Sequence, residues 1–118
     1  MNIRILAEDF AISSQVSPGD VTTIAAAGYR TVVCNRPDGE EALQPAAHEV
    51  EAACDEHGID FHYLPFSGAE LPAGLIESFR SALTDADGPV LAYCRSGQRC
   101  IYLWAATAAA GGPPRDDP

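Results

Sequence analysis

The sequence contains no lysine, and all seven of its basic residues are arginines. Asp and Glu together number 17, which leaves a formal net charge of −10. Nucleic acid and anionic membranes repel a chain of this charge, so neither is expected as a partner. No stretch approaches the roughly 18–20 apolar residues of a membrane span. The start also lacks the hydrophobic segment of a signal peptide, so we expect the protein in the cytoplasm.

The sequence also lacks the cysteine pattern of a metal site or of a secreted disulfide scaffold. Its four cysteines are Cys34, Cys54, Cys94 and Cys100, and their spacings do not form the paired dyads of zinc ligands. Without an export signal, reduced thiols are the expectation. The sequence therefore predicts no metal and no cofactor.

Internal repeats and linkers are absent too, and a chain of 118 residues is the size of one domain. Apolar and β-branched runs predict four strands. The first leads from "RIL" towards "FAIS", and the others are "TVVCN", "FHYLP" and "VLAYC". Helical periodicity between them, with Pro near the starts and Gly at the ends, predicts helices over residues 17–28, 45–58, 72–83 and 98–111. We expect residues 1–112 to form the domain and residues 113–118 to be a flexible tail.

Strands that alternate with helices predict an α/β domain. The expected architecture is a three-layer sandwich, with a mainly parallel sheet of four to five strands and helices on both faces. Ligands of such sheets bind beyond the carboxyl ends of the strands. Cys94 stands at such an end, directly after the apolar run "VLAY".

The segment "CRSGQR", residues 94–99, has the composition of an anion-binding turn between that strand and the last helix. The N–H groups of Arg95, Ser96, Gly97 and Gln98 would line it, together with the positive end of the helix. Gly97 permits the tight path, and Arg99 could fold its guanidinium over the concavity. Such surroundings lower the pKa of a cysteine thiol. The simpler alternative is a buried Cys94 that only packs and an Arg99 that lies on the surface.

"CRSGQR" resembles the active loop of rhodanese-type sulfurtransferases and cysteine-dependent phosphatases. With "SSQVSPGDVTTIAAAGYRTVVCNRPDGEE" and "YLPFSGAELP", the chain is similar over residues 3–110 to the beta-lactamase-hydrolase-like protein, phosphatase-like domain family. The resemblance implies a dual-specificity-phosphatase-like fold. It also implies Cys94 as the nucleophile and Arg99 as the anion clamp.

Departures from the phosphatase pattern favour sulfur transfer. Four residues separate Cys94 from Arg99 instead of five, and Cys100 stands where phosphatases have a hydroxyl. Gly68 occupies the place of the usual general acid, for which Asp38 and Glu70 are possible substitutes. The sequence thus favours a sulfurtransferase that carries a persulfide on Cys94. A phosphatase that acts through a phosphocysteine is the alternative, and a non-catalytic module that binds anions or persulfides is a further one.

Three other residues complete the hypothesis. Arg36 either meets the anionic part of the substrate or pairs with Asp38 or Glu40 in its own loop. Cys34 or Cys100 could act as a resolving thiol for Cys94, or each could be an ordinary buried cysteine. The expected partners are a small anionic or sulfane-sulfur substrate and a protein thiol acceptor.

Overall fold

The computed structural model of the chain describes residues 1–111, and the expected tail at residues 113–118 lies outside them. Strands and helices alternate along the chain nearly as the sequence predicts. The elements are β1 (Ile3–Ala7), β2 (Phe10–Ser13), a short 3-10 helix η1 (Pro18–Asp20), α1 (Val21–Ala26), β3 (Thr31–Cys34), α2 (Ala47–Glu56), β4 (Asp60–Tyr63), α3 (Leu75–Asp85), β5 (Val90–Tyr93) and α4 (Gln98–Ala109).

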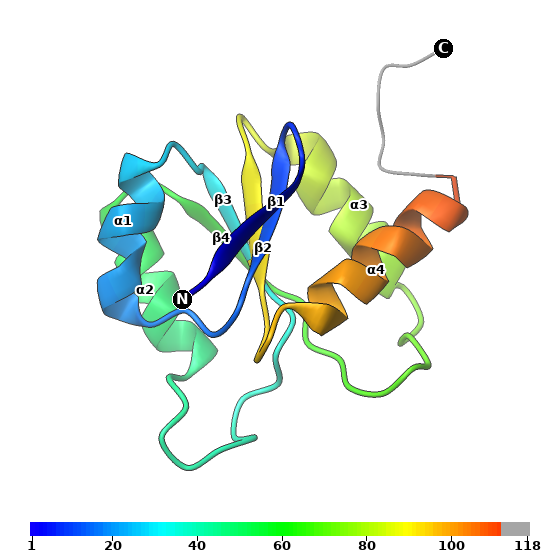
Figure 1. Cartoon of the computed structure of the whole chain (residues 1–118), viewed down its shortest axis with the longest axis horizontal. Helices are drawn as coiled ribbons and strands as arrows, with labels where there is room; N and C mark the ends of the chain where they lie inside the picture. The colour runs from blue at the N-terminus through cyan, green and yellow to red at the C-terminus, as the bar shows by residue number, and fades with distance from the viewer. Residues whose placement is uncertain (112–118) are drawn as a thin grey trace.

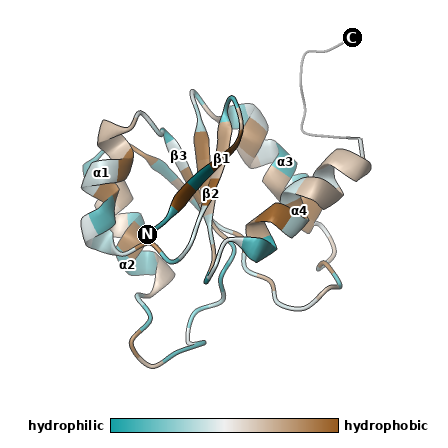
Figure 2. Ribbon diagram, viewed as in Figure 1, coloured by the Kyte–Doolittle hydropathy of each residue, from teal (hydrophilic) through white to brown (hydrophobic). Residues whose placement is uncertain are grey.

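The five strands form one sheet in the order β1-β2-β5-β3-β4. β1 runs antiparallel to β2, and every other pairing is parallel. All residues of β2, β3 and β5 are buried, whereas the edge strands β1 and β4 are partly exposed. The apolar colouring of the central strands in Figure 2 follows this burial. The predicted mainly parallel sheet of four to five strands is confirmed.

Helices cover both faces of the sheet, as Figure 1 shows: α1 and α2 lie on one side, and α3 and α4 on the other. Side chains alternate across each strand, so neighbouring residues enter different cores. Val32 and Leu91 pack with α1 and α2, whereas Val33 and Ala92 pack with α3 and α4. The three-layer α/β architecture is therefore confirmed. Among residues 1–111, no helix combines the length and the apolar composition needed to cross a bilayer.

The parallel strands place the loops that follow them at one edge of the sheet. β2, β3, β4 and β5 all end there, and their next segments begin at residues 14, 35, 64 and 94. Backbone hydrogen bonds join these segments: the Asn35 N–H donates to the Tyr93 carbonyl at 2.8 Å, and the Gln15 N–H donates to the Arg95 carbonyl at 3.3 Å. This edge is the expected location of a ligand site in a parallel sheet.

Candidate active site

The turn between β5 and α4 has the tight path expected for "CRSGQR". Gly97 precedes the first turn of α4 with φ +97°, which is left-handed backbone. A Cβ atom at this position would lie 2.8 Å from Ile12 Cδ1, which is too close for a side chain. The backbone conformation therefore favours glycine here, and any larger residue would also require the buried Ile12 side chain to shift. Ser96 Oγ accepts the Gln98 N–H at 3.4 Å, which further shapes the turn.

The Cys94 side chain points into this turn and is almost fully buried, with 1% of the residue exposed. The Gly97 N–H donates to Cys94 Sγ at 3.1 Å. A hydrogen bond from the Cys100 thiol, followed by the backbone N–H groups of Cys100, Arg99 and Gly97, lowers the Cys94 pKa to about 5, although burial opposes this. Hydrogen bonds to the charged form favour that form, so Cys94 is a thiolate at neutral pH.

Arg99 is held by an ion pair that the sequence does not predict. Its guanidinium donates to both carboxylate oxygens of Glu40, at 2.8 and 2.9 Å, and to the Phe66 carbonyl at 3.2 Å. The hydrogen bonds from Arg99 lower the Glu40 pKa to about 2, so Glu40 is a carboxylate at neutral pH. The partners lie 59 residues apart in the chain, and only the fold brings them together.

Arg36 is buried beside this pair, and each of its three side-chain nitrogens donates a hydrogen bond. Its Nε donates to Glu40 at 2.9 Å, its Nη2 to Glu41 at 2.7 Å, and its Nη1 to the Gln15 side-chain oxygen at 2.8 Å. The expected pairing within its own loop is thus present with Glu40. Glu41 and Gln15 are site residues that the sequence analysis missed. The doubled acid in "DGEE" was the only signal for Glu41, and Gln15 had none.

Neither substitute for the general acid reaches the turn. Asp38 Oδ1 accepts the Ala47 N–H at 2.8 Å, so this carboxylate caps the start of α2. Glu70 is exposed, and within residues 1–111 it forms no hydrogen bond or ion pair. Gly68 lines a pocket of about 270 Å³ with Ala69, Gln98, Arg99 and Tyr102, and none of these described lining residues is a carboxylate. The structure therefore leaves Arg99 with one neighbouring acid, Glu40, and that acid is ionised.

The thiols occupy different sides of the sheet. Cys100 packs in the same core cluster as Cys94, whereas Cys34 belongs to the cluster on the opposite face. Cys34 Sγ donates to the Arg36 carbonyl at 3.3 Å, and burial raises the pKa of both Cys34 and Cys100. All four cysteines are free. Cys100 is therefore the better placed of the two possible resolving thiols. Within residues 1–111, no group of three or more His, Cys, Asp or Glu side chains forms a metal site.

Known proteins resemble this chain over nearly its whole length. The family described as "Beta-lactamase hydrolase-like protein, phosphatase-like domain" matches residues 2–111. The beta-lactamase hydrolase-like protein of Xylella fastidiosa is 32% identical over 117 residues, which are 99% of this chain and 27% of that protein.

Solved structures give the same result. A candidate phosphatase from Neisseria meningitidis Z2491 is 39% identical, with a TM-score of 0.84 over 97% of this chain and 81% of that one. The core catalytic domain of the PP-IP phosphatase Siw14 from S. cerevisiae is 15% identical, with a TM-score of 0.67 over 94% of this chain and 67% of that one. At such low identity this second likeness shows the fold alone.

Proposed function

The chain belongs to the family of beta-lactamase hydrolase-like protein, phosphatase-like domains, and we propose that it is a cysteine-dependent phosphatase that cleaves small phosphate monoesters. The family and fold are those of a phosphatase-like enzyme. The observation that carries the proposal is the Cys94 thiol, whose pKa is lowered to about 5 in a turn of N–H donors beside Arg99. The chain spans 27% of the length of its curated relative, so the proposal concerns this domain.

The proposed reaction has two steps. The Cys94 thiolate attacks the phosphorus of the ester, so that the S–P bond forms while the bond from phosphorus to the leaving oxygen breaks. Water then attacks the phosphocysteine, releases inorganic phosphate and restores the thiolate. In both steps the turn N–H groups would hold the phosphoryl oxygens, and Arg99 would neutralise part of their charge after it exchanges Glu40 for the substrate.

Among residues 1–111, the structure places no carboxylic acid beside Arg99 other than the ionised Glu40, and this limits the leaving group. A positioned general acid contributes about 10²–10⁴ in rate. Glu40 is ionised and Asp38 caps α2, so the leaving oxygen must take its proton from water. We therefore expect aryl phosphates, whose leaving groups are weak bases, to be cleaved much faster than alkyl phosphates.

Sulfur transfer is the second candidate, and specific observations favour it. The turn is one residue shorter than in phosphatases, and the largest contribution that lowers the Cys94 pKa comes from a thiol, that of Cys100. In this reaction the thiolate takes the outer sulfur of thiosulfate and releases sulfite. Cyanide or a thiolate then removes that sulfur, and no acid is needed. The matching family is described as phosphatase-like, and the 39% identical solved structure is described as a phosphatase, so we rank phosphoryl transfer first.

One experiment separates the candidates: turnover of p-nitrophenyl phosphate and of thiosulfate with cyanide, with intact mass recorded after each substrate. Phosphate release that Cys94→Ser and Arg99→Ala abolish supports the phosphatase. A gain of one sulfur that Cys94→Ser removes, without phosphate release, refutes it in favour of sulfur transfer. Binding without turnover of either substrate would instead show a non-catalytic module. Cys54→Ala, which removes a core thiol on α2, serves as the matched control and should retain activity.

The wider setting stays a prediction. A thiolate nucleophile must remain reduced, which fits residence in the cytoplasm, and cell fractionation would test that location. A protein thiol acceptor belongs only to the sulfur-transfer candidate. Its test is a gain of one sulfur by a protein thiol that is incubated with the persulfide form of the wild-type chain.

A further inference from the structure

Beside the Cys94 turn, three arginines and two glutamates form an alternating chain. Glu40 is shared by Arg99 and Arg36, at 2.8 and 2.9 Å. Glu41 is shared by Arg36 and Arg95, at 2.7 and 3.7 Å. Each carboxylate therefore bridges two guanidinium groups. We call Glu40 the inner carboxylate and Glu41, with Arg36 and Arg95, the outer group.

This cluster stands out against the charge of the whole chain. The protein has a net charge of −10, yet three of its seven arginines gather here with only two carboxylates. The cluster thus keeps a net positive charge of one. Arg36 is anchored, with 3% of its side chain exposed, while the Glu41 side chain is 55% exposed and can move into water. Arg36 is thus held in place by its surroundings, whereas the side chains of Glu41 and Arg95, 55% and 68% exposed, can move.

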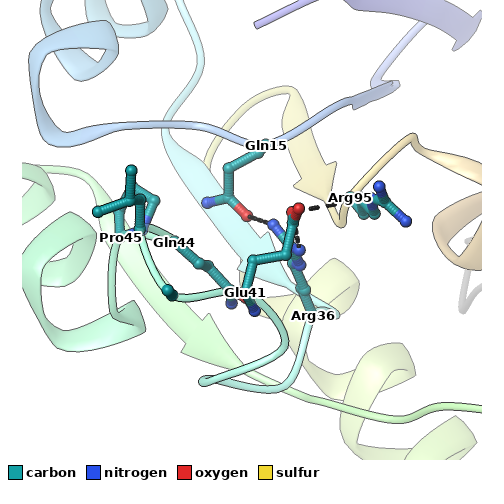
Figure 3. Close-up of a pocket in the computed structure, with 8 residues that line it drawn as sticks. Gln15, Arg36, Glu41, Gln44, Pro45 and Arg95 are labelled. Atoms are coloured by element: carbon teal, nitrogen blue, oxygen red, sulfur yellow. Dashed lines mark hydrogen bonds and ion pairs between the residues drawn. The ribbon is translucent and has the colours of Figure 1, made fainter.

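The outer group opens into a pocket. A cavity of about 530 Å³ is lined by Arg36, Arg95, Glu41 and Gln15 on its polar side, and by Ala42, Leu43, Gln44 and Pro45 on the rest. Figure 3 shows the Glu41 carboxylate between the guanidinium groups of Arg36 and Arg95, with the Gln15 side-chain oxygen on Arg36. Arg95 directly follows Cys94, so the pocket adjoins the turn of the nucleophile.

We propose that this pocket is a second anion subsite, so that the substrate is a phosphate ester that bears a second anionic group, a carboxylate or a phosphate. The proposal rests on the proposed phosphatase function. Glu40 and Glu41 occupy the two anion positions of the free protein. The scissile phosphoryl group exchanges with Glu40 at Arg99, and the second anionic group exchanges with Glu41 at Arg36 and Arg95.

The exchange is chemically balanced. A guanidinium group that gives up one carboxylate for another anion keeps its charge partner and its hydrogen bonds, while the half-exposed Glu41 regains water. The carbon frame that joins the two groups of the substrate would lie against Ala42, Leu43 and Pro45. A neutral substituent would leave Glu41 in place and gain nothing from Arg95.

The test compares phenyl phosphate with 3- and 4-carboxyphenyl phosphate, whose carboxylates change the acidity of the leaving phenol little. We expect the better carboxylated isomer to have a kcat/KM about fivefold or more above that of phenyl phosphate, as a charged partner in a partly exposed site provides. Arg95→Ala should bring this ratio close to one, and Glu41→Gln should raise it. Arg4→Gln, an exposed arginine on β1, removes the same charge away from the pocket and should leave the ratio unchanged.

The outcomes are distinguishable. Turnover of all three esters with equal kcat/KM, unaffected by Arg95→Ala, overturns the second subsite and leaves the phosphatase proposal standing. No turnover of any ester overturns the phosphatase function and the subsite with it. A ratio that Arg4→Gln lowers as much as Arg95→Ala does would show a general charge effect and would also overturn the subsite.

Discussion

Replacing Cys100 with alanine should raise the pKa of the Cys94 thiol and so weaken its reactivity at low pH. The Cys100 side chain makes the largest of the contributions that lower the Cys94 pKa to about 5, ahead of three backbone N–H groups. Alanine cannot donate a hydrogen bond to the thiolate. Serine can, and Cys100→Ser is therefore the matched control for the same position.

The size of the change follows from the energy of one such bond. A hydrogen bond to a charged group is worth about 1.5–3 kcal/mol, and one pKa unit corresponds to about 1.36 kcal/mol. Loss of the Cys100 donor should thus raise the Cys94 pKa from about 5 to roughly 6–7, still below its ordinary value of 9.0 because the backbone donors remain. At pH 6 the thiolate fraction would fall from about nine-tenths to between about a tenth and a half.

The assay is the rate of alkylation of Cys94 by iodoacetamide from pH 4.5 to 10, followed by peptide mass. Burial of Cys94 slows the reaction at every pH, so the midpoint of the profile is the readout. Cys34, Cys54 and Cys100 are buried with raised pKa values, so they should not react below pH 8. A wild-type midpoint near 9 would refute the thiolate. An unchanged midpoint in Cys100→Ala would refute the role of the Cys100 thiol.

Three further changes test neighbouring parts of the site. Gly97→Ala should lower the unfolding free energy, measured in urea, by at least about 1 kcal/mol more than Gly68→Ala does. Both glycines have a positive φ, but only a side chain at position 97 would meet Ile12. Equal losses in the two variants would show that the space beside Gly97 is not limiting. Glu40→Gln should strengthen inhibition by inorganic phosphate up to about fivefold by releasing Arg99, whereas weaker inhibition would mean that Glu40 positions Arg99 for the anion. Asp38→Ala should lower the unfolding free energy by about 0.5–2 kcal/mol, because α2 loses its cap, while kcat is retained. A large loss of kcat without loss of stability would instead show that Asp38 is the general acid.

The nucleophile turn was predictable because its causes are local. Cys94, Gly97 and Arg99 lie within six residues, and the path of the chain from β5 into α4 depends on the conformational freedom of Gly97 and on the helix start. The same holds for the order of strands and helices, since hydrophobic periodicity and terminal Pro and Gly act over a few residues.

Most partners of the arginines were not predictable in this way. The Arg99 guanidinium forms an ion pair with Glu40, and Arg36 binds Gln15 and Glu41 in addition to Glu40, which the sequence does offer as a partner in the same loop. An arginine side chain has many rotamers, and its choice depends on which charges the fold places within reach. Sequence spacing contains no such information for residues that are 21 or 59 positions apart.

By itself, then, the sequence determined the α/β class, the family and the turn that presents Cys94, because neighbouring residues specify each of them. Only the tertiary structure decided that Asp38 caps a helix, that Cys100 rather than Cys34 shares the face of Cys94, and that two glutamates occupy the arginines. The reason is physical: the ends of parallel strands bring separate loops together, and the side-chain alternation of each strand decides which face of the sheet a residue joins.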